Sequence, residues 1–295
     1  MSLGAADRDA PESMRLGDGR RLSFARYGDP HGRPLFYFHG MPGSRLEAGV
    51  IDAPARENGI LVVAPDRPGM GCSDFKRGRT LLDWASDVAE LAGYFGMRRF
   101  GVIGTSGGGP YALAAAYVLG EQLDFAASVA GRGPPGENAL RPERIMFRLA
   151  EHSPIVIRAG FLITARAARR RSAAGLRMAL GPYLCEADRA ILADPDVAGL
   201  MAANQRESFR QGSRGPALDA VLIFRRWGFA PAEIRVPVHF FHGTADQLVP
   251  SACSRYLAAT MRHSTLTTFQ CQGHLCIVDR ASEILRVPPR ASPAV

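Results

Sequence analysis

The stretch Val102-Ile103-Gly104-Thr105-Ser106-Gly107-Gly108-Gly109-Pro110 decides how the rest of the chain is interpreted. It continues a short apolar, β-prone run at 100–103, and an alanine-rich segment that favours a helix follows at 111–119. A Gly-x-Ser-x-Gly sequence between a strand and a helix is typical of a nucleophile elbow. Its glycines allow a turn tight enough to expose the Ser106 hydroxyl at the helix N-terminus, where developing negative charge is favoured. The stretch therefore predicts Ser106 as a nucleophile.

A plain glycine-rich turn or a phosphate-binding loop is the alternative for the same residues. No lysine follows the glycines, which excludes a P-loop, and the spacing is not Gly-x-Gly-x-x-Gly. The plain turn stays open on this motif alone.

Strand and helix patterns alternate along most of the chain. Residues 14–27 form a predicted hairpin around a Gly17-Asp18-Gly19 turn. Further strands are predicted at 35–38, 60–64, 100–103, 125–129, 236–243 and 266–269, and helices at 46–58, 80–95, 111–119, 251–261 and after His274. Strands that alternate with helices in this way predict an α/β fold, with a parallel sheet covered on both faces.

This alternation stops after residue 134. From 135 to 234 the chain is rich in arginine and alanine, mostly helix-forming and almost without strand patterns. We interpret this segment as a helical cap inserted into a core formed by 14–134 and 235–288. Residues 1–13 are predicted to be a disordered N-terminal segment without signal-peptide features, and 289–295 to be a C-terminal tail.

A serine nucleophile needs a base to take its proton and a third group to orient that base. His274 stands in a loop between the last predicted strand and the last helix, at the edge of the sheet that faces a ligand crevice. Asp246 directly follows a buried strand and belongs to the same edge, although an Asx turn is the alternative for it alone. His239 and His242 lie along a strand and are interpreted as core or strand-end residues. The chain order Ser106, Asp246, His274 favours a catalytic triad.

Acyl transfer also needs hydrogen-bond donors where charge develops on the carbonyl oxygen. Gly107, the residue after the nucleophile, would supply one backbone N–H. The loop His39-Gly40-Met41-Pro42-Gly43 follows a buried strand and would supply the other, from Met41. A simple turn is the alternative for this loop.

Taken together, these motifs resemble those of α/β-hydrolase fold enzymes, specifically the capped esterases and proline-iminopeptidase-like enzymes. The resemblance covers about residues 14–285. It rests on the loop at 39–43, the Asp-Arg-x-Gly-x-Gly-x-Ser segment at 66–73, the elbow, the Asp246 loop and Gly273-His274. It implies an acyl-enzyme on Ser106, which water hydrolyses with His274 as base and Asp246 as the orienting acid.

Two departures from related enzymes narrow the activity that the resemblance implies. Epoxide hydrolases and haloalkane dehalogenases of this fold resemble the chain in the oxyanion loop, but they carry aspartate at the nucleophile position, and Ser106 argues against both. Proline iminopeptidases typically have Gly-x-Ser-Trp-Gly, whereas Gly107 stands where tryptophan would. Aminopeptidase activity is therefore not expected.

Composition and net charge limit the kinds of partner that the protein is expected to bind. The net charge of +8 in 295 residues comes almost wholly from arginine, since Lys76 is the only lysine. Such an excess can favour nucleic acid or acidic lipid, but no nucleic-acid module is recognisable and no apolar run is long enough to span a membrane. We therefore expect a small-molecule acyl substrate, no nucleic acid and no membrane.

The cysteines and histidines give no sign of a cofactor. Five cysteines without a CxxC pair favour reduced thiols in a cytoplasm. No His/Cys cluster has metal-ligand spacing, so neither a metal nor a cofactor is expected. The sequence carries no signal for an oligomeric state.

The cap is the least informative part of the sequence. Eight apolar residues are candidates either to line a substrate pocket or to pack the cap on the sheet, with packing favoured: Met146, Phe147, Leu149, Ile155, Val156, Ile157, Phe161 and Leu162. Four arginines would either attract an anionic substrate or form a solvated helix face, with the solvated face favoured: Arg166, Arg169, Arg170 and Arg171. Trp227 and Phe229 are expected to anchor the cap to the core.

Three functions follow from these observations. The leading one is a serine hydrolase acting on a small carboxylic ester, lactone or thioester. The second is hydrolysis of an amide or of a carbon–carbon bond by the same triad. The third is a non-catalytic ligand-binding protein, because fold does not fix function.

Overall fold

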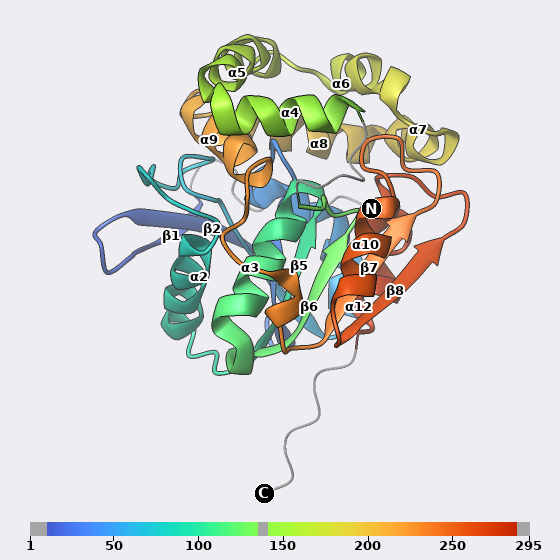
Figure 1. Cartoon of the computed structure of the whole chain (residues 1–295). Coiled ribbons are helices and arrows are strands. Elements are labelled where there is room, and N and C mark those ends of the chain that lie inside the picture. Colours follow the sequence, from blue (N-terminus) through green and yellow to red (C-terminus); the bar gives the residue numbers. More distant parts are fainter. Residues whose placement is uncertain (1–10, 135–140, 288–295) are drawn as a thin grey trace, which may run out of the picture.

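An eight-stranded sheet forms the centre of the protein (Figure 1). The structure is a computed structural model that describes residues 11–134 and 141–287, with the backbone alone at 141–143. The strand order is β1-β2-β4-β3-β5-β6-β7-β8, and all neighbours from β4 to β8 run parallel, whereas β2 pairs antiparallel with β1 and β4. The strands are β1 (Glu12–Arg15), β2 (Arg21–Gly28), β3 (Arg33–Phe38), β4 (Ile60–Pro65), β5 (Phe100–Thr105), β6 (Leu123–Val129), β7 (Val238–Gly243) and β8 (Ser264–Phe269).

Helices cover both faces of this sheet, so the predicted α/β fold is confirmed. One face packs against α2 (Asp83–Tyr94), α3 (Gly109–Leu119) and α10 (Ala252–Thr260), and the other against α1 (Asp52–Glu57), α11 (Cys276–Asp279) and α12 (Ala281–Leu285). Successive residues of a strand point to opposite faces, so Phe36 and Phe38 pack in the first layer while Leu35 and Tyr37 pack in the second.

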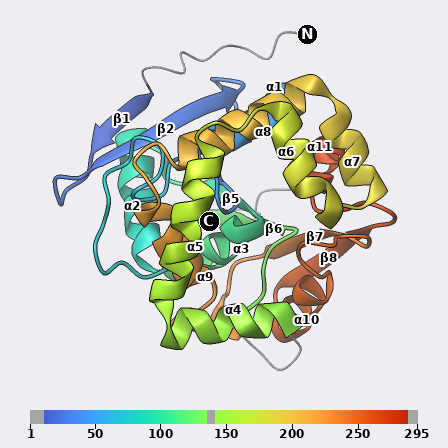
Figure 2. The same cartoon turned by 90° about the horizontal axis from the view of Figure 1, so that it is seen from above.

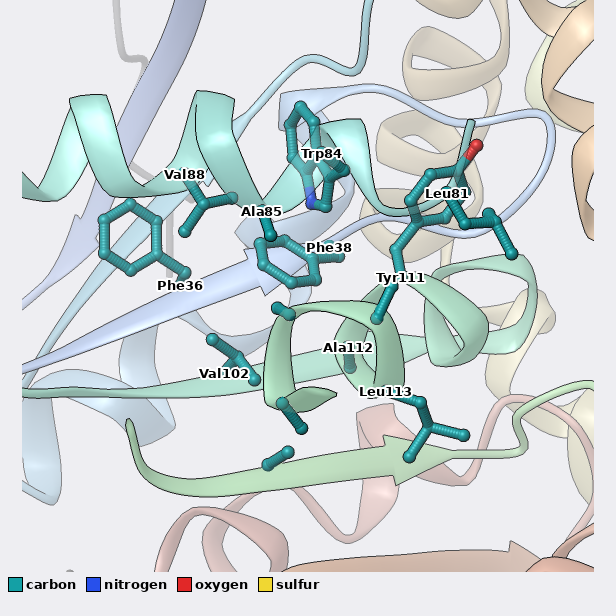
Figure 3. Close-up of a cluster of buried hydrophobic side chains, with 14 of the residues drawn as sticks. Phe36, Phe38, Leu81, Trp84, Ala85, Val88, Val102, Tyr111, Ala112 and Leu113 are labelled. Carbon is teal, nitrogen blue, oxygen red and sulfur yellow. The ribbon is translucent and has the colours of Figure 1, made fainter. Parts of the chain in front are cut away.

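Aromatic rings pack among aliphatic side chains in the core under α2 and α3 (Figure 3). The ring of Trp84 on α2 lies 5.4 Å from that of Phe38 and 6.2 Å from that of Tyr111, both edge-on. Such tilted contacts are favourable beyond the area that they bury. This cluster fixes α3, and therefore the turn that precedes it, against the sheet.

Two sequence predictions need correction at element boundaries. β1 begins at Glu12, so the last two residues of the segment predicted as disordered, 1–13, belong to a strand that is paired with β2. The helix predicted at 46–58 is divided into a 3-10 helix (Arg45–Ile51) and α1. Pro54 lacks the N–H that a continuous α-helix needs at this position. Residues 1–10 and 288–295, including the predicted tail at 289–295, lie outside the described residues.

Between β6 and β7 the described chain forms helices that lie over one end of the sheet (Figure 1). We call α4 to α9 the cap layer. They are α4 (Arg141–His152), α5 (Pro154–Ala168), α6 (Ala173–Leu180), α7 (Glu186–Ala193), α8 (Pro195–Ser208) and α9 (Arg214–Ile223). Seen from above, α6 and α7 lie apart from α4 and α5 (Figure 2). The domain boundaries 14–134, 135–234 and 235–288 stay a prediction, and residues 135–140 lie outside the described part.

Buried ion pairs join the cap layer to loops of the core. Arg67, after β4, binds Asp219 of α9 at 2.8 Å, and both side chains are inaccessible to solvent. Arg45 binds Glu207 of α8 at 2.7 Å while also pairing with the buried Asp66. Charges withdrawn from water need such partners. These pairs therefore fix α8 and α9 relative to the sheet.

Candidate active site

The predicted strand, turn and helix are present at 100–119. β5 ends at Thr105, one 3-10 turn (Ser106–Gly108) follows, and α3 begins at Gly109. Ser106 has a φ of 50°, a left-handed conformation that residues other than glycine rarely adopt. A Cβ at Gly104 would overlap the carbonyl oxygen of Gly108, and one at Gly108 would overlap that of Phe38. The flanking glycines are thus required by the close approach of β5, α3 and β3.

His274 and Asp246 are hydrogen-bonded. His274 Nδ1 lies 2.8 Å from Asp246 Oδ2, and the Asp246 side chain is fully buried. The other carboxylate oxygen, Oδ1, accepts the N–H groups of Leu248 and Val249 at 2.8 and 2.9 Å. Burial raises the pKa of Asp246, but the His274 charge and these hydrogen bonds outweigh burial and hold it well below its usual range. Asp246 is therefore ionised and its geometry is fixed.

The environment of His274 favours its protonated form. Burial lowers the pKa of the ring, but the charge and hydrogen bond of Asp246 raise it more, so the pKa of His274 lies above its usual value. In the neutral ring, Nδ1–H donates a hydrogen bond to the ionised Asp246, and Nε2 is then left as the proton acceptor.

His242 also contacts Asp246, which sequence reasoning missed. Its Nε2 lies 3.2 Å from Asp246 Oδ2, and its Nδ1 lies 2.7 Å from Ser254 Oγ. His242 is buried at the end of β7, in agreement with its interpretation as a core or strand-end residue. Its position four residues before Asp246 was the available signal, but that signal is not specific.

Ser106 and His274 line the same cavity, which has a volume of about 160 Å³. Three residues of the predicted oxyanion loop, Gly40, Met41 and Pro42, line it as well. Asp246, Gly107, His39 and Gly43 do not line it. The cavity therefore gathers the predicted nucleophile and base, and the remaining predicted residues support them from the surrounding structure.

Met41 lies next to the elbow. A Cβ at Gly107 would be 2.7 Å from the Met41 Cβ and 3.3 Å from its backbone nitrogen, so Met41 leaves no room for a side chain at Gly107. Within the described chain the Met41 N–H has no hydrogen-bond partner. Gly107 is in the first turn of a helix, where N–H groups lack an intrahelical acceptor. Both donors are thus free to bind an oxygen atom beside Ser106.

Buried charges hold the loop at 39–43 in place. Glu47 Oε1 accepts the Gly40 N–H at 2.8 Å and the Thr105 hydroxyl at 2.5 Å, which ties the loop to the end of β5. Arg67 donates to the carbonyl oxygens of His39 and Gly40 at 2.6 and 2.9 Å. Burial and the Arg67 charge lower the pKa of His39 well below its usual value, so its ring is neutral and structural.

Glu47 could not be identified from the sequence as part of this site. It stands three residues after Ser44, a spacing that signals the start of a helix. Only the fold brings its carboxylate to the Gly40 N–H. Arg67, in contrast, belongs to the segment at 66–73 that carried the resemblance.

Asp188 of α7 holds the loop that carries His274. Its side chain is buried, and its two oxygens accept the backbone N–H groups of His274 and Leu275 at 2.9 and 2.8 Å. Sequence reasoning missed Asp188, because a polar residue at the start of a cap helix looks like a surface position. A residue of the cap layer therefore determines where the predicted base lies.

We expect Asp188→Ala to lower kcat/KM for ester hydrolysis by roughly 10- to 100-fold, because small displacements of a base weaken proton transfer strongly. Two buried N–H groups would also lose their acceptors, at about 2–4 kcal/mol in the free energy of unfolding. Steady-state kinetics and urea unfolding measure both effects. Glu186→Ala, an exposed acidic position on the same helix, is the matched control. Equal kinetics for the two variants would contradict this role of Asp188.

The cavity wall differs from the sequence-based expectation. It includes aliphatic residues from α6 to α8, from the loop between α6 and α7 and from the loop after β7: Leu176, Leu180, Leu184, Leu192, Met201 and Leu248. None of the eight candidates proposed from the sequence is among its lining residues. Met146, Phe147, Leu149, Ile157 and Phe161 pack in or against the core clusters, as favoured, whereas Ile155, Val156 and Leu162 are exposed on α5 and do neither. Periodicity identified the helices but not the direction of their apolar faces.

The aromatic residues after α9 and the arginines at the end of α5 agree with the interpretations that the sequence favoured. Trp227 is buried in the core cluster, and Phe229 stacks on it with ring centroids 5.8 Å apart. Arg166, Arg169 and Arg170 are exposed, and Arg171 is half-buried.

Among the described residues no group of three His, Cys, Asp or Glu side chains is placed to bind a metal ion. Nor does any described helix have the length and apolar character to cross a bilayer.

A family model described as the alpha/beta hydrolase family matches residues 31–287. The chain therefore belongs to the alpha/beta hydrolase family. The predicted fold class and the resemblance to this family are thereby confirmed, and the family is one of hydrolases.

Solved structures of similar proteins agree with this fold. An esterase from Exiguobacterium antarcticum has a TM-score of 0.69 at 16% identity, over 93% of this chain and 96% of that one. An enol-lactonase from Burkholderia xenovorans LB400 has a TM-score of 0.66 at 18% identity, over 92% of this chain and 96% of that one.

A soluble epoxide hydrolase from Corynebacterium sp. (strain C12) is similar in sequence to part of the chain: it is 38% identical over 104 residues, which is 34% of each chain. This match spans about a third of that relative's length.

Proposed function

We propose that the protein is a serine hydrolase that cleaves a small carboxylic ester, lactone or thioester. The observation that carries the proposal is the single cavity that Ser106 shares with His274, whose Nδ1 is bound by the buried Asp246. Nucleophilic acyl transfer requires a hydroxyl, a base that takes its proton and a carboxylate that orients the base. The esterase and the enol-lactonase among the similar structures are in keeping with it.

In the proposed mechanism, Ser106 Oγ attacks the substrate carbonyl carbon while His274 Nε2 takes the hydroxyl proton. The Met41 and Gly107 N–H groups bind the oxygen on which negative charge develops. His274 then gives the proton to the leaving alcohol, which leaves an acyl group on Ser106. Water attacks this ester with His274 as base, and the acid is released. No metal or cofactor takes part in any of these steps.

The cavity wall supports a substrate of limited size. A volume of about 160 Å³ with a largely aliphatic lining suits a short aliphatic or cyclic acyl group. The cytoplasmic location that we propose rests on the five cysteines without a CxxC pair.

Three other reactions are weaker candidates for the same site. The Corynebacterium relative is named an epoxide hydrolase. Epoxide hydrolases of this fold carry aspartate at the nucleophile position, where this chain has Ser106, and this difference argues against epoxide hydrolysis. Hydrolysis of an amide or of a carbon–carbon bond would use the same three residues. Nothing in the cavity favours either bond over an ester.

Hydrolysis of p-nitrophenyl esters from acetate to decanoate tests the proposal. We expect turnover that is greatest for short chains and declines once the acyl group exceeds the cavity. Labelling of Ser106 by a fluorophosphonate reports the activated serine independently of substrate. Labelling without turnover of any ester would shift the assignment to an amide or carbon–carbon substrate. The absence of both would contradict a catalytic role.

The pH dependence should report His274. Only its neutral ring accepts a proton, so kcat/KM should rise with pH through a midpoint above 6.5, since the pKa of His274 is raised. Asp246→Asn removes the charge that stabilises the protonated ring, so its midpoint should move to lower pH while the plateau falls about 10³- to 10⁴-fold. Asp279→Asn, an exposed position, is the control. A midpoint that does not move in Asp246→Asn would contradict the pairing.

A further inference from the structure

The outer surface of α5 is apolar and exposed. Ile155, Val156, Leu162 and Ile163 expose 67, 50, 51 and 70% of their surface. They are spaced i, i+1, i+7 and i+8, so they share one face of the helix. The opposite face, with Ile157, Ala165 and Ala168, is buried in the cap layer. Figure 1 shows α5 on the outer side of that layer, away from the sheet.

Arginines border this apolar face, and no acidic residue does so within the segment. Arg158 lies beside it, and Arg166, Arg169 and Arg170 extend it at the C-terminal end of α5, all of them exposed. The segment 153–185 contains six arginines and no aspartate or glutamate. An exposed aliphatic stripe with arginine along its edges is the pattern of a helix that lies in the interface of a membrane.

From this arrangement we propose that α5 docks the protein on an anionic lipid surface. Ile155, Val156, Leu162 and Ile163 would enter the boundary between headgroups and acyl chains, while the arginines bind lipid phosphates. This mode of binding differs from spanning a membrane, which no described helix can do. The sequence-based expectation of no membrane partner rested on the arginine excess of the whole chain and on the lack of a spanning run, and not on which residues of one helix share a face.

Other occupants fit this face less well. A second copy of the chain would bring two sets of like-charged arginines together around the apolar stripe, which opposes association. Nucleic acid would match the arginines, but it offers no apolar layer for four aliphatic side chains, and α5 exposes no aromatic residue on which bases stack. An anionic bilayer complements both the charge and the apolar surface.

Co-sedimentation with vesicles tests this proposal on the full chain. We expect binding to vesicles of 70% phosphatidylcholine and 30% phosphatidylglycerol, and much weaker binding to pure phosphatidylcholine or in 0.5 M NaCl. Leu162→Gln with Ile163→Gln should weaken binding by tenfold or more, because both side chains lose insertion. Arg166→Gln with Arg170→Gln should weaken it by roughly 10- to 30-fold.

Control variants separate membrane binding by α5 from catalysis and from general changes in surface charge or hydrophobicity. Arg98→Gln with Arg262→Gln removes the same charge from exposed positions of the core, and Val118→Gln changes an exposed apolar residue of α3; both should bind as the wild type does. Ser106→Ala should also bind unchanged. Loss of binding in the arginine variant but not in Leu162→Gln with Ile163→Gln would overturn insertion. Two results would overturn the proposal outright. The first is a dimer of the wild type in solution that dissociates in the variant Leu162→Gln with Ile163→Gln, and the second is failure of the wild type to sediment with the anionic vesicles.

Discussion

Replacing Ser106 by alanine should lower kcat/KM for p-nitrophenyl esters by roughly 10⁵-fold and abolish fluorophosphonate labelling. The substitution removes the only atom of Ser106 that can form the acyl-enzyme, while His274, Asp246 and the Met41 N–H stay in place. A small residual rate would come from the remaining donors in the cavity.

The folded state should tolerate this change. Serine and alanine both carry a Cβ, so the strain of a φ of 50° is the same in each. The melting temperature and circular dichroism should therefore match those of the wild type. Ser128→Ala is a suitable control, because Ser128 lies in the neighbouring β6, and its buried hydroxyl makes no hydrogen bond within the described structure. Residual activity above 1% in Ser106→Ala would assign the nucleophile to another residue.

Replacing Asp219 by alanine should destabilise the fold by about 3–5 kcal/mol, because it leaves buried positive charges without their partner. Asp219 is fully buried and pairs with Arg67 and Arg79 at 2.8 Å each, while the Tyr111 hydroxyl donates to it at 2.5 Å. Burial raises the pKa of this carboxyl, but the Arg67 and Arg79 charges hold it well below its usual range. Its stabilisation is therefore present at neutral pH and is lost only in acid, below the pKa of an unfolded aspartate near 4.

Activity should fall together with stability in this variant. Arg67 binds both Asp219 and the carbonyl oxygens of His39 and Gly40, so loss of the carboxylate also releases the loop that carries Met41. Urea unfolding at pH 7 measures the stability change, and kcat/KM at a temperature where the variant remains folded measures the second effect. Asp196→Ala, an exposed position on α8, should change stability by less than about 0.5 kcal/mol. A loss below 1 kcal/mol in Asp219→Ala would contradict the importance of this network.

Local sequence was sufficient for the fold class, and it predicted the main residues of the candidate site. The turns that carry Ser106, Asp246 and His274 each follow a predicted strand. Parallel strands bring their carboxyl ends to one edge, and so predict that such residues are neighbours. Ser106 and His274 do line one cavity. Gly104 is a local requirement too, since a side chain there would overlap the Gly108 carbonyl oxygen, whereas Gly108 is required by the approach of Phe38 from β3, which is distant in the sequence.

Residues that act across long distances in the sequence depended on tertiary structure. Asp188 reaches the His274 backbone from the cap layer, and Glu47, in the 3-10 helix after the 39–43 loop, reaches Thr105 at the end of β5. No local pattern distinguishes such a buried carboxylate from one in a helix cap or on the surface. The direction of the cap helices was hidden for the same reason: the period of α5 is that of any amphipathic helix, and only packing decided that Ile157 is buried while Ile155 and Leu162 face outward. Local periodicity fixes which residues share a face, whereas contacts distant in sequence decide what that face meets.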